Sequence, residues 1–85
     1  MAQVLVTLKV MPKEAGIDLD KLEGEIKSSV NPDRIVKEPI AFGLVALKVS
    51  KLVEDAEGQI EAMENKLGKL DGVGEIEVIE VTRTI

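Results

Sequence analysis

The sequence predicts an α+β fold of the ferredoxin-like type, a four-stranded antiparallel sheet with two helices on one face. Two stretches carry apolar residues at the helical spacing of three and four, and four others are apolar or alternate between apolar and polar. Their order is β-α-β-β-α-β, which divides into two β-α-β halves with right-handed crossovers. The 85 residues provide enough chain for one core and not for two.

Residues 3–11 alternate as a strand with one buried face does, and Pro12 ends this strand. The apolar face is formed by Val4, Val6, Leu8 and Val10. A helix follows, with Asp18 or Asp20 as its candidate N-terminal cap and Asn31-Pro32 at its end. Its apolar stripe is formed by Leu19, Leu22, Ile26 and Val30. We expect this stripe to pack against the sheet.

Two strands, residues 34–38 and 44–49, are expected to meet at a corner that reads Pro39-Ile40-Ala41-Phe42-Gly43. The second strand is apolar enough to lie in the middle of a sheet. Phe42 is the only aromatic residue, so the core is built from Val, Ile, Leu and Met. Phe42 is either the largest core residue or part of an interaction surface at the corner.

A second helix is expected after its candidate cap, Asp55, and Asp71-Gly72 indicates the turn that follows it. The apolar stripe of this helix is formed by Ile60, Met63, Leu67 and Leu70. The last strand runs from Gly74 to Ile85, and its alternation slips at Val78-Ile79. A β-bulge, or a strand that is apolar on both faces, would explain the slip. We expect the first and third strands, the most apolar ones, to occupy the middle of the sheet.

Composition excludes several kinds of site. Cys and His are both absent, which excludes disulfides and thiolate metal sites and removes the usual general base. No Gly-rich phosphate loop is present. The carboxylates of residues 54–57 and 75–77 are interpreted as a helix start and a solvated strand face. We therefore expect neither an enzyme nor a bound metal or cofactor.

The net charge is −5, whereas sequence-independent binding of nucleic acid needs a positive face. The N-terminal stretch lacks the basic region of a signal peptide, and no apolar run approaches the roughly 20 residues of a membrane span. We expect a cytoplasmic protein with no direct contact to nucleic acid or membrane, and a monomer when free.

Three segments match a known family. They are Glu38-Pro39-Ile40-Ala41-Phe42-Gly43-Leu44-Val45-Ala46-Leu47, then Val53-Glu54-Asp55, then Val81-Thr82-Arg83 near the end. They resemble the archaeal form of translation elongation factor 1-beta. The resemblance covers essentially the whole chain, is close at the Pro-x-x-Phe-Gly corner and is looser in the first helix.

The resemblance implies a guanine-nucleotide exchange factor, with residues 1–85 as a single exchange domain and no cofactor. Its partner would be elongation factor 1-alpha, the GTPase that delivers aminoacyl-tRNA to the ribosome. The family's corner aromatic, which packs against the GTPase, falls on Phe42. The eukaryotic C-terminal Asn-Lys, whose Lys disturbs the magnesium and phosphate region, falls on Thr82-Arg83. The partner-binding residues implied are Ile40, Ala41, Phe42, Gly43, Thr82, Arg83 and Thr84. Arg in place of Lys keeps the charge but replaces a compact ammonium with a planar guanidinium.

Two alternatives come from other functional classes. The stretch from Leu67 to Val78 is similar to the helix-to-strand junction of amino-acid-binding ACT domains, which implies a small ligand-binding regulatory module that dimerises. An RNA-binding sheet of the same topology would need exposed aromatic residues, and a single Phe does not provide them.

Overall fold

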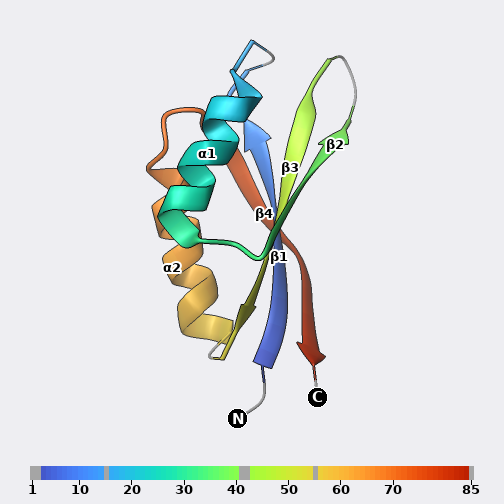
Figure 1. The fold of residues 1–85 in the computed structure, drawn as a ribbon, viewed down its shortest axis with the longest axis vertical. Coiled ribbons are helices and arrows are strands. Elements are labelled where there is room, and N and C mark those ends of the chain that lie inside the picture. The colour runs from blue at the N-terminus through green and yellow to red at the C-terminus, as the bar shows by residue number, and fades with distance from the viewer. Residues whose placement is uncertain (1–2, 15, 41–42, 55, 85) are drawn as a thin grey trace.

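A computed structural model describes residues 3–14, 16–40, 43–54 and 56–84 of the chain. The elements, in order, are β1 (Gln3–Pro12), α1 (Leu19–Val30), β2 (Arg34–Pro39), β3 (Val45–Val53), α2 (Ala56–Gly68) and β4 (Val73–Thr84). The strands form one antiparallel sheet in the order β2-β3-β1-β4, and both helices lie on the same side of it (Figure 1). The predicted α+β, ferredoxin-like arrangement is confirmed, with the first and third strands in the middle.

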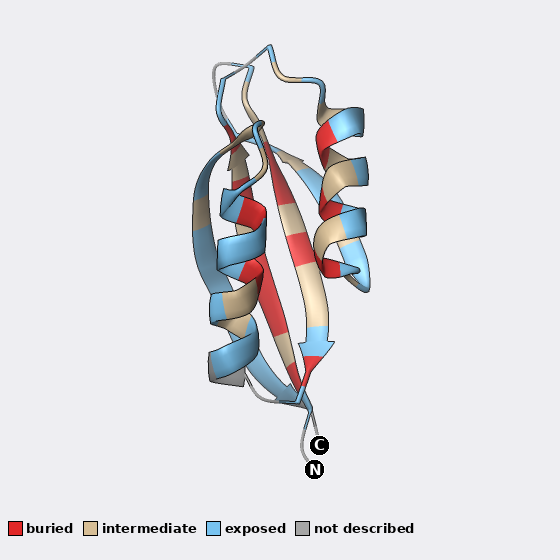
Figure 2. Cartoon of the chain, turned by 90° about the vertical axis from the view of Figure 1, so that its left-hand side faces the viewer, coloured by how far each residue is buried: buried red, intermediate tan, exposed pale blue. Residues whose placement is uncertain are grey.

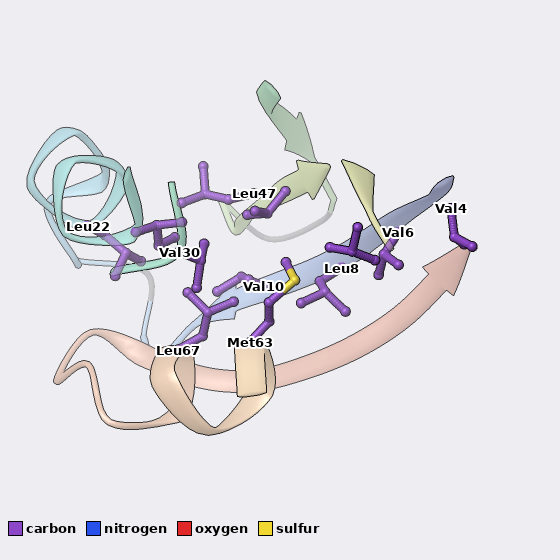
Figure 3. Close-up of a cluster of buried hydrophobic side chains, with 12 residues drawn as sticks. Val4, Val6, Leu8, Val10, Leu22, Val30, Leu47, Met63 and Leu67 are labelled. Carbon is purple, nitrogen blue, oxygen red and sulfur yellow. The ribbon is translucent and has the colours of Figure 1, made fainter. Parts of the chain in front are cut away.

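The core lies between the two helices and the two central strands (Figure 2). Every second residue of β1 from Val4 to Val10 is buried, because these side chains share the face that the helices cover. Figure 3 shows them meeting side chains of both helices and β3. The buried cluster consists of Val4, Val6, Leu8, Val10, Leu22, Ile26, Val30, Leu47, Val49, Val53, Met63 and Leu67. Most of the two predicted stripes enter the core in this way. Ile60 and Leu70 pack against it, Leu19 stays outside it, and Leu70 lies beyond the end of α2 at Gly68.

Helix α1 begins at the first of its two candidate caps. The Asp18 carboxylate accepts hydrogen bonds from the backbone N–H groups of Asp20 and Lys21, at 3.1 and 3.2 Å. The helix ends as predicted at Asn31, which has a φ of 49° and donates its N–H to the Lys27 carbonyl. The candidate cap of the second helix, Asp55, lies outside the described residues.

Strand β3 continues to Val53, four residues beyond its predicted end at Val49. The prediction was short because Ser50 and Lys51 are polar, yet both have partners inside the fold. The hydroxyls of Ser50 and Thr7 are hydrogen-bonded at 3.1 Å. The Lys51 ammonium donates to the carbonyl of Val30, at the C-terminal end of α1. These contacts hold the second half of β3 in the sheet.

Strand β4 contains a bulge, one of the two explanations given for the slip in alternation at Val78-Ile79. Leu8 pairs with Val78 and Thr7 with Glu80, so Ile79 is the extra residue on β4. A second irregularity falls between Met11 and Pro12, at Gly74. A Cβ at Gly74 would lie 2.9 Å from the Cα of Lys13, and only glycine permits this approach. The bulge at Ile79 keeps both halves of β4 in register with β1.

Candidate partner-binding site

The first candidate group lies at the hairpin that joins β2 and β3. The strands pair from Arg34 with Ser50 to Pro39 with Val45. The backbone N–H of Ile40 then donates to the Leu44 carbonyl at 2.9 Å, which leaves three residues in the loop. Gly43, the last of the three, has a φ of 77°, as three-residue hairpin loops require at this position. The predicted site residues Ala41 and Phe42 lie outside the described residues.

Strand β2 and the residue that follows it, Ile40, expose apolar surface next to this loop. Ile40 is 41% exposed, and the predicted site residue Gly43 is exposed as well. Val36 is 39% exposed and lies opposite Lys48 on the sheet face that carries no helix. The prediction included Ile40 but not Val36. No helix covers this face, which is why apolar side chains on it stay accessible, as the 40% exposure of Leu52 on the central strand β3 also shows.

One ion pair lies within the hairpin, and a second attaches the hairpin to α1. Lys48 on β3 lies 2.6 Å from Glu38 on β2, and Lys37 on β2 lies 2.9 Å from Asp20 on α1. Hydrogen bonding and charge from Lys37 lower the pKa of Asp20, and Asp20 in turn raises the pKa of Lys37. The hydrogen bond from Lys48 lowers the pKa of Glu38. These contacts favour the charged forms of Asp20, Lys37 and Glu38.

The second candidate group lies at the C-terminal end of β4. Thr82 pairs with Leu5 and Arg83 with Val4, so their side chains are on opposite faces of the sheet. Both are exposed. Arg83 lies on the face that carries the helices, whereas the Thr82 hydroxyl donates to the Glu80 carboxylate at 3.2 Å on the other face. Thr84 pairs with Gln3 at the end of the ladder.

The two candidate groups lie at opposite ends of the sheet. Figure 1 shows the β2–β3 hairpin at one end of the long axis and the C-terminal end of β4 at the other. The described part of the molecule measures 42 × 22 × 17 Å. The fold therefore separates the groups instead of combining them in one pocket, and a single partner would have to contact both ends.

A small cavity of about 280 Å³ lies between the start of α1 and the turn before β4. None of the residues that line it belongs to either candidate group. They are Gly16, Ile17, Asp18, Lys21, Leu22, Glu25, Asp71 and Gly72. Over the described ranges, no three acidic side chains come together as metal ligands, and neither helix is long and apolar enough to cross a membrane.

Comparison with known proteins decides the family. Residues 5–84 match the model of the EF-1 guanine nucleotide exchange domain, from β1 to the end of β4. This chain belongs to the elongation factor 1-beta family. The elongation factor 1-beta of Methanothermobacter thermautotrophicus is 46% identical over 87 residues, which cover 98% of each chain. That of Methanoregula boonei is 45% identical over 83 residues, 96% of this chain and 98% of its own.

A more distant archaeal elongation factor 1-beta, from Thermoplasma acidophilum, is still 36% identical over 86 residues, covering 96% of this chain and 98% of its own. The resemblance to elongation factor 1-beta inferred from the sequence segments is thus confirmed. These comparisons give no support to the alternative of an ACT-like ligand-binding domain.

Proposed function

We propose that this chain promotes GDP release and GTP reloading on elongation factor 1-alpha, acting as a single guanine-nucleotide exchange domain over residues 1–85. The observation that carries the proposal is the match to the exchange domain over residues 5–84. The chemistry of the chain agrees with it, since exchange needs a binding surface and no catalytic base, metal or cofactor of its own.

The mechanism follows from thermodynamic linkage. A protein that binds the nucleotide-free GTPase more tightly than the GDP-bound form weakens GDP binding by the same factor. No covalent bond is made or broken, so the exchange factor only accelerates release, and the excess of GTP over GDP sets the direction. The whole effect depends on contacts that differ between the two states of the GTPase.

We assign these contacts to the two exposed ends of the sheet. At the hairpin, Phe42 with Ile40, Ala41 and Gly43 would supply an apolar contact to the GTPase. At the other end, Arg83, between Thr82 and Thr84, would place a cation near the magnesium and phosphates. A guanidinium attracts phosphate oxygens and repels Mg²⁺, which weakens GDP binding by competition for the same ligands. Because the two ends are far apart, they would contact separate parts of the GTPase surface.

The test is the release of a fluorescent GDP analogue from an archaeal elongation factor 1-alpha, with excess GTP, in the presence and absence of this protein. We expect the release rate to rise with the concentration of the protein and to reach a plateau. The Glu61→Ala variant, changed at an exposed position of α2, should behave like the wild type. An unchanged release rate with a folded, GDP-loaded GTPase would refute the proposed function.

A further inference from the structure

The outer edge of β4 carries a concentration of exposed apolar side chains. Val78, Ile79 and Val81 are 37%, 41% and 51% exposed, and all three lie within four residues. In the described part of the sheet, β4 pairs with β1 alone, so its outer side is a free strand edge. Such an edge offers backbone N–H and C=O groups to a further strand.

The two faces of this edge differ in chemistry. Val78 and Val81 lie opposite Leu8 and Val6, on the face that carries the helices. The three acidic residues of β4 all lie on the other face and are exposed. Their partners across the ladder to β1 are Met11 for Glu75, Lys9 for Glu77 and Thr7 for Glu80. Only Glu77 therefore has a cation opposite it, and the outer edge is acidic on one face and apolar on the other.

This arrangement selects among strands that could pair with the edge. A second copy of β4 would bring carboxylates against carboxylates, and like charges directly opposite each other destabilise a strand pair. A strand with basic side chains on one face and apolar side chains on the other would satisfy both faces at once. The exposed valines offer apolar contact to such a strand. The carboxylates disfavour strands that carry acidic side chains on the facing positions, so the edge selects for basic ones.

We propose that the outer edge of β4, from Glu75 to Val81, binds an extended segment of a partner protein in which basic and apolar side chains alternate. The segment adds to the sheet as a fifth strand. Its cations face Glu75 and Glu80, and its apolar side chains cover Val78 and Val81. This site is separate from the nucleotide-exchange activity and does not depend on it.

The experiment uses the full chain, isotopically labelled for amide NMR, and a synthetic heptapeptide of alternating Lys and Val with blocked ends. A peptide of the same composition, with its Lys and Val residues in two blocks, is the matched control. We expect the alternating peptide to shift amide signals of β4 and to slow hydrogen exchange there, while β2 is unaffected. The control peptide should bind about tenfold more weakly, because as a strand it cannot place all its Lys side chains on one face and all its Val side chains on the other.

Two charge-reversal variants test the acids. Glu75→Lys with Glu80→Lys reverses the two carboxylates of β4 that have no cation opposite them on β1, whereas Glu61→Lys with Glu64→Lys makes the same change of net charge at exposed positions of α2. The first pair should weaken the alternating peptide about tenfold, and the second should leave it nearly unchanged. Equal binding of both peptides, equal effects of both variants, or signal changes outside β4 would each overturn the proposal.

Discussion

Arg83 is the residue on which the proposed mechanism depends most. It is exposed at the end of a strand, and no ion pair holds it among the described residues. Its position opposite Val4 places it on the face of the sheet that carries the helices. A side chain in this position is available to a partner and contributes little to folding.

We therefore expect Arg83→Ala to slow GDP release about tenfold or more while the melting temperature stays close to that of the wild type. Arg83→Lys keeps the cation and should recover part of the activity. Release kinetics and thermal unfolding of the three proteins check both statements. A large loss of stability in Arg83→Ala would instead make the residue structural.

Replacing Gly43 or Gly24 by Ala tests the backbone conformation at each position, because the two substitutions should change the free energy of unfolding in opposite directions. Gly43 has a φ of 77°, which an L-residue adopts at a cost, whereas Gly24 lies inside α1, where an added Cβ would meet no atom within 4 Å beyond its chain neighbours and the helix's own backbone. Gly43→Ala should lower the free energy of unfolding by about 1 kcal/mol, and Gly24→Ala should raise it by up to about 1 kcal/mol. Chemical denaturation of both variants measures the two signs. A stabilising Gly43→Ala would show that the loop does not need the left-handed conformation.

At the scale of the element, the bulge in β4 absorbs one residue between two halves that are each in register. Val6 pairs with Val81 and Leu8 with Val78 on either side of Ile79. The bulge allows apolar side chains in both halves of β4 to point toward the helices. It also decides that Arg83 is on that face and Thr82 on the other.

Deletion of Ile79 should leave the fold intact, with a change in the free energy of unfolding of about 1 kcal/mol, because both halves keep their partners on β1. Deletion of Ser50 is the control. Strand β3 pairs with β1 and β2 without a register shift, so this deletion turns side chains to the wrong face. We expect the second variant not to fold, as monitored by circular dichroism and amide spectra. Equal damage in both variants would contradict this account of the bulge.

The ion pair between Lys37 and Asp20 connects two elements, the hairpin and α1, and it depends on pH. The pKa of Asp20 is lowered in the folded state, so its stabilising effect is present above the ordinary pKa of Asp and is lost as the pH falls through the lowered value. The pKa of Lys37 is raised, so the pair also persists well above neutral pH. Both groups are at the surface, and the effect is correspondingly small.

The free energy of unfolding of wild type should exceed that of Asp20→Asn at neutral pH, and the difference should shrink below about pH 4. Urea unfolding at a series of pH values measures the difference. In a Lys37→Met background, Asp20→Asn should no longer produce this change with pH. If the change with pH persists in the Lys37→Met background, the ion pair between Lys37 and Asp20 is not its cause.

For the whole molecule, the important feature is that the hairpin and the C-terminal end of β4 lie at opposite ends of the long axis (Figure 1). Changes at sites that are far apart and share no partner usually add in free energy. The separation therefore makes a prediction about exchange that neither end makes alone.

Phe42→Ala should lower the exchange rate more than Glu61→Ala does. In the double variant with Arg83→Ala, the two increases in activation free energy should add to within about 0.5 kcal/mol. GDP-release kinetics of the single and double variants provide the test. Full activity of a folded Phe42→Ala variant would remove Phe42 from the interface, and strong non-additivity would mean that the two ends act as one unit.

The sequence by itself determined the six elements, their order and the faces that enter the core. The reason is that periodicities of 2 and 3.6 residues in apolar side chains reflect burial directly, as Leu22, Ile26 and Val30 of α1 and Met63 and Leu67 of α2 show. It also located the slip in alternation at Val78-Ile79, and the pairing with β1 shows that this slip is a bulge. The end of the first helix at Asn31 could also be predicted from the sequence, because Asn31-Pro32 is a local signal that ends a helix.

Only the tertiary structure decided how far β3 extends, because Ser50 and Lys51 look like the end of a strand until Thr7 and α1 supply their partners. It also decided that the two groups of site residues lie at opposite ends, and that Val78, Ile79 and Val81 remain exposed. In the sequence, exposed apolar residues of an edge strand alternate with polar ones just as buried apolar residues do. Whether a neighbouring strand covers them depends on contacts between residues that are distant in the sequence.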